Sequence, residues 1–253
     1  MLPLDAHSWA NLADAYGNAS EVPSLLLALA RRADVWSELY GSLCPQGTPF
    51  EAAFAAVPHV VSIASLRAAN ERVEHLTFVG MVAAGDVEVP SKLAEAYDRA
   101  CASARELVVE ALRADVTDDE AAALVWTALA LRGVHRAAEA LMTFVDGSTI
   151  QTRCPGDSCG VELYLDHHGD GWTPLFLPGN EFGPSSPIEP PNHLEADTEW
   201  TDPTAPAQMA GIAEHHGYPT LAAKLRSLMG TVHCPKCGEA FVLWDEILEP
   251  TEL

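Results

Sequence analysis

Four cysteines, in two short pairs separated by a long stretch of chain, constrain this fold more than any other feature. The first pair lies in Cys154-Pro-Gly-Asp-Ser-Cys159-Gly, and the second in Cys234-Pro-Lys-Cys237-Gly. Each pair reads Cys-Pro, a short gap and then Cys-Gly. This pattern is typical of a tight turn that directs two thiolates at one point, with the glycine supplying the positive φ that the turn needs. Structural zinc takes four ligands in a tetrahedron. The two pairs therefore complete one site only if the chain folds back across the 74 residues between them.

The spacing predicts one structural Zn²⁺ per chain. Its expected ligands are Cys154, Cys159, Cys234 and Cys237. Two disulfides are the alternative interpretation. The N-terminus has neither the basic region nor the apolar core of an export signal, so we expect a reducing, cytoplasmic location, where paired cysteines favour metal. His233 could replace a cysteine ligand, whereas Cys44 and Cys101 lie in apolar helical contexts and are expected to be buried thiols.

Acidic residues far outnumber basic ones, above all in the second half of the chain. The formal net charge is −22. Residues 1–150 contribute −10, from 10 basic and 20 acidic residues, and residues 151–253 contribute −12, from 4 basic and 16 acidic residues. The 70 residues from Cys154 to Ala223 hold eleven acidic residues and no Lys or Arg. Such a field repels nucleic-acid phosphates and anionic lipid and attracts a basic partner. Solubility, or adaptation to a salty or acidic habitat, is the alternative explanation.

The first 145 residues are rich in Ala and Leu and contain recurrent helix start and stop signals. Two capping boxes, Thr48 to Glu51 and Thr117 to Glu120, mark helix starts. Pro23 and Pro90 mark two more starts, and Pro58 is expected to kink the helix that contains it. Glycines at 17, 41, 85 and 133 are placed as C-terminal caps. The expected helices are 7–16, 21–32, 34–43, 49–69, 71–84, 90–114, 118–132 and 134–145. No apolar run reaches the roughly 18–20 residues that a membrane span requires.

The character of the chain changes at residue 147. Short β-prone segments flank both cysteine pairs, at 148–153 and 161–165 and again at 231–233 and 240–244. They predict two β-hairpins that share one metal, in a zinc-ribbon-like module. Seven prolines between 178 and 206 exclude a helix and favour an irregular acidic loop, and two short helices follow at 205–216 and 219–229. The sequence thus predicts a mainly α fold: a helical domain over 1–146 and a small α+β zinc-binding module over 147–253.

One segment of the helical part resembles a known family. A W-x-x-L-Y…Q-G-T…A-x-x-A-V-P pattern is similar to that of HEAT-like bacterial proteins, which implies an α-solenoid over about residues 12–145 and an accessory or immunity-type role. The matching residues are Trp36, Leu39, Tyr40, Gln46, Gly47, Thr48, Ala53, Ala56, Val57 and Pro58. Pro45 stands where the pattern has a histidine, so a role for that histidine does not carry over.

No catalytic residues are predicted, because the sequence contains no recognised nucleophile, dinucleotide or P-loop motif. A metal-dependent hydrolase is one alternative, built on the pairs His167-His168 and His215-His216 with Asp166 and Asp170. The histidine spacing matches no helical metal motif, and adjacent histidines cannot both point inward from a regular element. Nucleic-acid binding through the zinc ribbon is a second alternative, but only Arg153 and Lys236 supply positive charge there.

The expected function is therefore non-enzymatic binding of a basic protein, for example a toxin that an immunity protein neutralises by covering its active site. Trp9, Trp36 and Trp126 occupy helical apolar positions and are expected in the core, whereas Trp172 and Trp200 are expected in loops. Acidic residues around an exposed aromatic would provide both electrostatic steering and an anchor. The candidate partner-binding residues are Trp172, Glu195, Asp197, Glu199 and Trp200.

Overall fold

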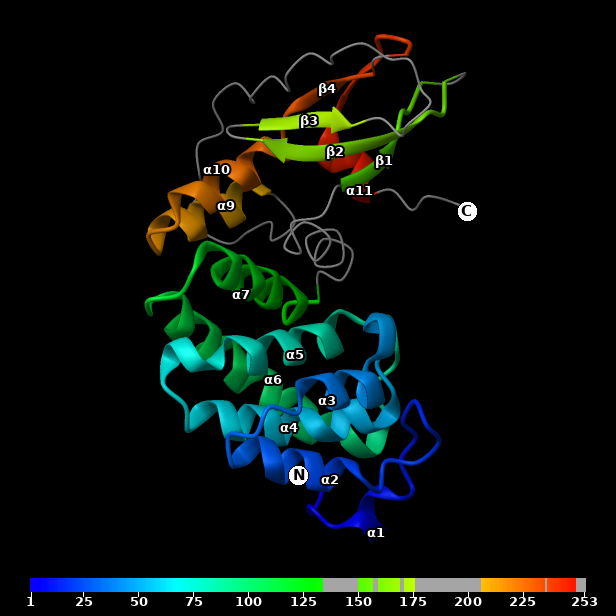
Figure 1. The fold of residues 1–253 in the computed structure, drawn as a ribbon, viewed down its shortest axis with the longest axis vertical. Helices are drawn as coiled ribbons and strands as arrows, with labels where there is room; N and C mark the ends of the chain where they lie inside the picture. Colours follow the sequence, from blue (N-terminus) through cyan, green and yellow to red (C-terminus); the bar gives the residue numbers. More distant parts are fainter. Residues whose placement is uncertain (134–149, 157–158, 169–170, 176–205, 235, 249–253) are drawn as a thin grey trace. The chain divides into compact units, whose positions relative to one another are not determined.

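The computed structural model of this chain describes residues 1–133, 150–156, 159–168, 171–175, 206–234 and 236–248 (Figure 1). The chain divides into two compact units. We call the first the helical unit; it comprises Met1–Val116 and Trp126–His135. The second, here the cysteine unit, comprises Thr117–Val125 and Arg136–Leu253. The chain is mainly helical, with small antiparallel strands towards the C-terminus, as the sequence predicts. The expected domain boundary at 146 and the expected helix 134–145 lie outside the described residues.

The helical unit is organised around one helix, α4 (Glu51–Ser65), which is apolar on nearly every side. It packs against α2 (Val22–Ala30), α3 (Trp36–Leu43), α5 (Val73–Ala84) and α6 (Ser91–Leu112). A helix that is hydrophobic all round has to be surrounded, and its small Ala side chains allow the neighbouring helices to approach closely. The helix continues through Pro58 and ends at Ser65, earlier than predicted. The 3₁₀ turn η2 (Ala69–Arg72) then leads into α5.

Close contacts explain why glycine stands at two positions of α5: Gly80 within the helix and Gly85 at its C-terminal cap. A Cβ atom on Gly80 would lie 2.7 Å from Thr127 Oγ1 and 3.0 Å from Thr127 Cα, in helix α7 (Asp118–Ala130). A Cβ atom on Gly85 would lie 2.3 Å from Cδ of Pro49. Gly85 does cap α5, but with a φ of −64°, so that close approach and not a left-handed turn requires glycine there. Gly133, which follows α7, has the expected positive φ of 81°.

Three expectations for the N-terminal helices are wrong: the length of the first helix, the capping box at Thr48 and the cap at Gly41. Helix α1 is only Ala6–Trp9, because the Asp14 carboxylate accepts a hydrogen bond from the backbone N–H of Tyr16 and forms a turn instead. The expected capping box at Thr48 does not form. Glu51 pairs with Lys92 at 2.7 Å, so its carboxylate serves tertiary structure. Gly41 lies inside α3 and is not a cap.

The second capping box, from Thr117 to Glu120, forms as predicted. The Thr117 hydroxyl accepts a hydrogen bond from the backbone N–H of Glu120, and the Glu120 carboxylate accepts one from the backbone N–H of Thr117. The start of α2 with Pro23 in its first turn and the start of α6 after Pro90 are also confirmed.

The residues that carry the family resemblance have structural roles in the helical unit. Gln46 and Gly47 both adopt positive φ, 53° and 79°, in the 3₁₀ turn η1 (Pro45–Gly47) that joins α3 to the segment before α4. Trp36 packs against Tyr40 and Phe78, with ring centroids 6.0 and 6.1 Å away. Trp9 and Trp126 are buried in the core as expected, but Trp36 is only half-buried.

The cysteine unit contains two small sheets. Strands β1 (Ile150–Arg153), β2 (Glu162–His168) and β3 (Gly171–Leu175) form an antiparallel sheet in the order β1-β2-β3, and β4 (Thr231–His233) pairs antiparallel with β5 (Ala240–Val242). The two hairpins around the cysteine pairs are thus confirmed. Strand β3 was not predicted; its Pro174 is tolerated because β3 lies at the edge of the sheet.

Helices support these strands. Helices α9 (Pro206–His215) and α10 (Pro219–Ser227) pack against each other, close to their predicted bounds. Residues 243 and 244, predicted as strand, begin helix α11 (Leu243–Leu248) instead. Leu163, Val232 and Leu243 are buried and contribute apolar side chains to the core of the unit.

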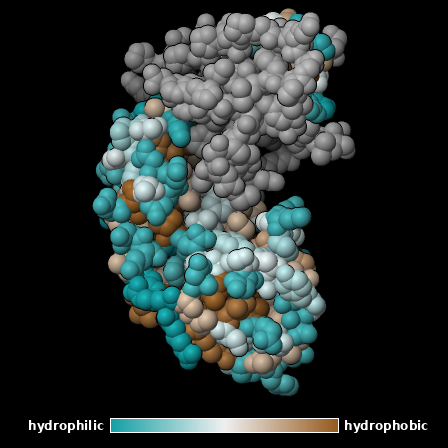
Figure 2. Space-filling model, viewed as in Figure 1, coloured by the Kyte–Doolittle hydropathy of each residue, from teal (hydrophilic) through white to brown (hydrophobic). Residues whose placement is uncertain are grey.

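The face of the helical unit seen in Figure 2 is mostly hydrophilic, with apolar patches between the hydrophilic side chains. Tyr16 and Leu66 are the most exposed large apolar side chains of the helical unit, at 81% and 83% exposure. Among the described helices, none is both long and apolar enough to cross a bilayer.

Candidate metal centre

Both cysteine pairs lie in loops that close with the same hydrogen bond. The backbone N–H of Cys154 donates to the carbonyl of Val161 at 3.0 Å, and that of Cys234 donates to the carbonyl of Glu239 at 2.8 Å. In each loop the acceptor is two residues after the second cysteine. The two extra residues of the first loop therefore leave its closure unchanged. Gly160 and Gly238, which follow the second cysteines, have φ of 49° and 79°, as the sequence pattern predicts.

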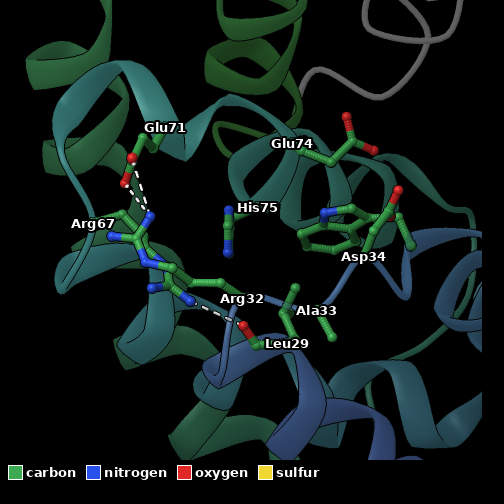
Figure 3. Close-up of a pocket in the computed structure, with 9 residues that line it drawn as sticks. Leu29, Arg32, Ala33, Asp34, Arg67, Glu71, Glu74 and His75 are labelled. Atoms are coloured by element: carbon green, nitrogen blue, oxygen red, sulfur yellow. Dashed lines mark hydrogen bonds and ion pairs between the residues drawn. The ribbon is translucent and has the colours of Figure 1, made fainter.

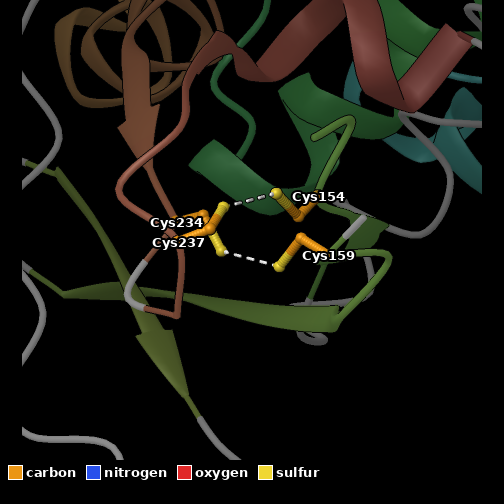
Figure 4. Close-up of side chains that lie close together, drawn as sticks. All are labelled: Cys154, Cys159, Cys234 and Cys237. Carbon is orange, nitrogen blue, oxygen red and sulfur yellow. Dashed lines mark hydrogen bonds between the residues drawn. The ribbon is translucent and has the colours of Figure 1, made fainter. Parts of the chain in front are cut away.

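The two loops bring four sulfur atoms together, although their residues are far apart in the sequence (Figure 4). All four Sγ atoms lie within 4.8 Å of one another. Cys154 Sγ is 3.5 Å from Cys237 Sγ, and Cys159 Sγ is 3.7 Å from Cys234 Sγ. Disulfide bonds are about 2.05 Å long, so these pairs are not disulfides. A tetrahedral zinc with bonds of about 2.3 Å separates its sulfur ligands by about 3.8 Å. The cluster therefore fits a tetrahedral metal ion.

Small side chains and backbone N–H groups complete the surroundings of the sulfurs. A Cβ atom on Gly156 would lie 3.5 Å from Sγ of both Cys154 and Cys237, so a larger residue would crowd the cluster. The backbone N–H groups of Gly156, Val161 and Glu239 each act to lower the pKa of the cysteine two residues before them. Such donors stabilise thiolates, which are the form that binds metal.

The four thiols differ in burial and in the direction of their pKa shifts. Cys154 and Cys234 are buried, at 2% and 1% exposure, whereas Cys237 is exposed. Burial raises the pKa of Cys154 well above its usual range, and the neighbouring thiols add to this effect. The hydrogen bond from the Val161 N–H lowers the pKa of Cys159. A cluster of thiols that cannot all ionise without a positive charge is the arrangement that a bound cation would stabilise.

Other predicted metal ligands do not join this cluster. His233 is exposed on β4, and within the described part of the chain the four cysteines are the one group of His, Cys, Asp or Glu side chains close enough to share a metal. His167 and His168 are consecutive residues of β2 whose side chains lie outside that description. The rings of His215 and His216 stack edge to face at 5.1 Å, at the end of α9. Asp170 lies outside the described residues.

Positive charge near the cluster is sparse. Arg153 lies 3.9 Å from the Glu162 carboxylate, which offsets its charge, and Lys236 is exposed in the second loop. The two remaining cysteines are buried thiols, as predicted, and burial raises the pKa of Cys44 to about 12 and that of Cys101 to about 11.

The candidate partner-binding residues are mostly outside the described residues. Glu195, Asp197, Glu199 and Trp200 all fall in the segment 176–205. Trp172 was expected in a loop, but its backbone is part of strand β3, where it pairs with His167.

No family model matches the chain, and no curated protein or solved structure matches it.

Proposed function

We propose that the four cysteines bind one Zn²⁺ ion with a structural role. The observation that carries the proposal is the approach of four Sγ atoms to within 4.8 Å of one another from two separate loops. Four thiolates in a tetrahedron suit zinc, and iron is the competing metal for such a site. Four protein ligands leave no open position for water or substrate, so a closed zinc site of this kind is structural and not catalytic. Under this proposal the two hairpins and their metal form a zinc-ribbon-like module.

Elemental analysis of the purified protein tests the metal. We expect one zinc per chain, and we expect Cys154→Ser and Cys234→Ser to lose it, because each removes a buried ligand. Cys101→Ser is the matched control: it also replaces a buried cysteine and should retain the full zinc content. A double variant lacking both Cys234 and Cys237 that still bound one zinc per chain would contradict a site shared by the two loops.

We further propose that the protein acts by binding a basic protein partner, with an HEAT-like helical unit as its scaffold. The support is the distribution of charge: eleven acidic residues and no Lys or Arg from Cys154 to Ala223. An acidic segment of this composition would accelerate association with a basic partner and oppose binding to nucleic acid. Neutralisation of a basic toxin by covering its active site is the role that combines this charge with the family resemblance.

Charge reversal tests the partner-binding proposal. A partner recovered from native lysate should associate with a rate that falls steeply as salt increases. Changing Glu195, Asp197 and Glu199 together to Lys should slow association, and Trp200→Ala should mainly speed dissociation. The matched control changes Glu38, Glu106 and Asp115, all exposed in the helical unit, to Lys and alters the net charge equally. If both triple variants slowed association to the same extent, net charge and not this segment would be responsible.

A further inference from the structure

A cleft of about 560 Å³ lies in the helical unit, around the end of α2 (Figure 3). Its walls come from the last turn of α2, the start of α3, the turn η2 and the start of α5. Leu29, Ala33 and Trp36 provide apolar surface. Charged side chains surround them: two arginines, Arg32 and Arg67, and three acidic residues, Asp34, Glu71 and Glu74. All of these residues belong to the helical unit, so the cleft is independent of the metal centre.

His75, in the centre of this cleft, is a buried polar side chain without a hydrogen bond. It is 7% exposed, and neither ring nitrogen has a hydrogen-bond partner within the described residues. The backbone of Glu71 acts to raise the pKa of the His75 ring. It does not form a hydrogen bond with either ring nitrogen. The ring lies between the two arginines with Glu71 on one side, and Glu74 and Asp34 on the other (Figure 3). Its edge-to-face contact with Trp36 has a centroid distance of 5.0 Å. Buried polar groups without partners are rare and call for an explanation.

His59 shows that burial alone does not leave a histidine without a hydrogen-bond partner. It is also 7% exposed, on the neighbouring helix α4, and its Nε2–H donates to the carbonyl of Leu2 at 2.9 Å. The fold therefore provides one buried histidine with a partner and leaves the other facing a cleft without one.

The arginines of the cleft retain donors that the fold does not use. Arg67 donates from Nη2 to the carbonyls of Leu29 and Ala30 at the end of α2. Among the described residues, no bond is made by its Nε or Nη1. Arg32 donates from Nη1 to both oxygens of Glu71 at 3.1 Å. That pair is exposed, with 62% of the Arg32 side chain and 43% of the Glu71 side chain accessible, so it contributes little to stability.

The backbone of Arg32 is also unusual. The N–H groups of Arg32 and Ala33 donate to the carbonyls of Leu29 and Ala28, which is the Schellman arrangement at the end of a helix. Arg32 occupies the position that usually belongs to glycine and has a φ of 68°. A side chain in this conformation is strained, and strained backbone of this kind is concentrated at binding sites. This position at the end of α2 sets Arg32 at the rim of the cleft.

We propose that this cleft binds a small organic carboxylate, which accepts hydrogen bonds from His75 and Arg67 and packs its apolar body against Trp36. In the free protein the Glu71 carboxylate occupies Arg32, as an internal substitute for the carboxylate of the ligand. Binding moves the exposed Arg32 side chain, uncovers the His75 ring and gives Arg32 a new anionic partner. The planar guanidinium groups suit a carboxylate in particular, because they can donate two parallel hydrogen bonds.

Benzoate is a suitable probe, with benzyl alcohol and benzylamine as controls of the same size. The whole chain as purified, isotopically labelled in its histidine rings, is titrated with each compound and followed by NMR. We expect benzoate to shift the His75 ring signals saturably, with millimolar or tighter affinity, as the binding energy per atom of small ligands allows. The alcohol and the amine should bind at least several-fold more weakly. If benzoate shifted His75 no more than benzyl alcohol did, the proposal would be overturned.

Three variants separate binding from folding. His75→Phe should abolish the benzoate-induced rise in melting temperature without lowering the melting temperature of the free protein, because it removes two unpaired buried nitrogens. His59→Phe, the matched control, should lower the melting temperature but keep the benzoate response. Glu71→Gln should strengthen benzoate binding several-fold, because it weakens the internal competitor for Arg32. Unchanged benzoate affinity in both His75→Phe and Glu71→Gln would place the probe elsewhere and refute the assignment.

Discussion

His75 and His59 lie on adjacent helices and are equally exposed, yet their different surroundings change how each affects the stability of the protein. Burial lowers the pKa of both rings. For His59 the hydrogen bond to the Leu2 carbonyl opposes this effect. For His75 burial lowers the pKa to about 4, and the positive charge of Arg67 adds to the decrease. His75 is therefore neutral in the folded protein over a pH range in which an exposed histidine is protonated.

This difference predicts a pH-dependent contribution to the stability of the helical unit. Between pH 6.5 and about 4 the unfolded chain binds a proton at His75 that the folded chain does not. The contribution is fully present above pH 6.5 and is lost as the pH falls through this range. We expect the free energy of unfolding to fall less steeply in His75→Phe than in the unsubstituted protein. Urea unfolding at a series of pH values, read from amide exchange in α4 and α5, measures the difference. Parallel pH curves for the two proteins would contradict the shifted pKa.

At the residue scale, the sequence identified the cysteine cluster but not His75. The cysteines were predictable because each pair carries its own turn residues, and Gly160 and Gly238 adopt the positive φ that the pattern requires. The importance of His75 depends on burial and on the absence of a partner, which are properties of the packed fold. The sequence analysis expected Trp36 in the core and gave no signal for the His75 cleft beside it.

At the scale of the helix, glycine has opposite effects at different positions. Gly41 and Gly80 both lie inside helices, where glycine is less favourable than alanine by about 1 kcal/mol. A Cβ atom on Gly41 would make an ordinary contact with Tyr16 Oη at 3.7 Å. On Gly80 the same atom would lie 3.0 Å from the backbone of Thr127, where nothing flexible can move aside.

These contacts predict opposite signs for the same substitution. Gly41→Ala should stabilise the helical unit by up to about 1 kcal/mol. Gly80→Ala should destabilise it by about 1–3 kcal/mol, because overpacking between helices outweighs the gain in helix propensity. Thermal unfolding of the two variants beside the unsubstituted protein is sufficient. A stabilised Gly80→Ala would mean that the two helices separate readily.

The capping boxes show what sequence can and cannot settle about elements. Thr117 and Glu120 form their box because, among the described residues, neither side chain has a competing partner. Thr48 and Glu51 have the same spacing, but Lys92 and the backbone N–H of Ala13 bind the Glu51 carboxylate instead. Local patterns therefore predicted most elements, and tertiary contacts decided the exceptions. Strand β3 and helix α11 were missed for the same reason, since pairing and packing and not local propensity determine them.

At the scale of the whole molecule, the two units gain stability from different sources. The helical unit buries a continuous apolar core around α4, including Phe54, Val57 and Val60. In the cysteine unit, β4 and β5 contain only three residues each and the sheet of β1–β3 is also small. Small sheets of this size are marginal by themselves. The proposed zinc ion would therefore supply a large part of the folding free energy of the cysteine unit and little of that of the helical unit.

Metal removal should consequently affect the two units differently. Treatment with a strong chelator under reducing conditions should abolish amide-exchange protection in β1, β4 and β5, while protection in α4 and α6 persists. The exposed Cys237 gives the chelator access to the metal. Protection should return when zinc is added back. Cys44 and Cys101 provide the internal control, because these buried thiols should stay unreactive towards an alkylating reagent while the four cluster cysteines become reactive. Simultaneous loss of protection in α4 would show that the metal stabilises the whole chain, whereas no loss in β4 would exclude a structural metal.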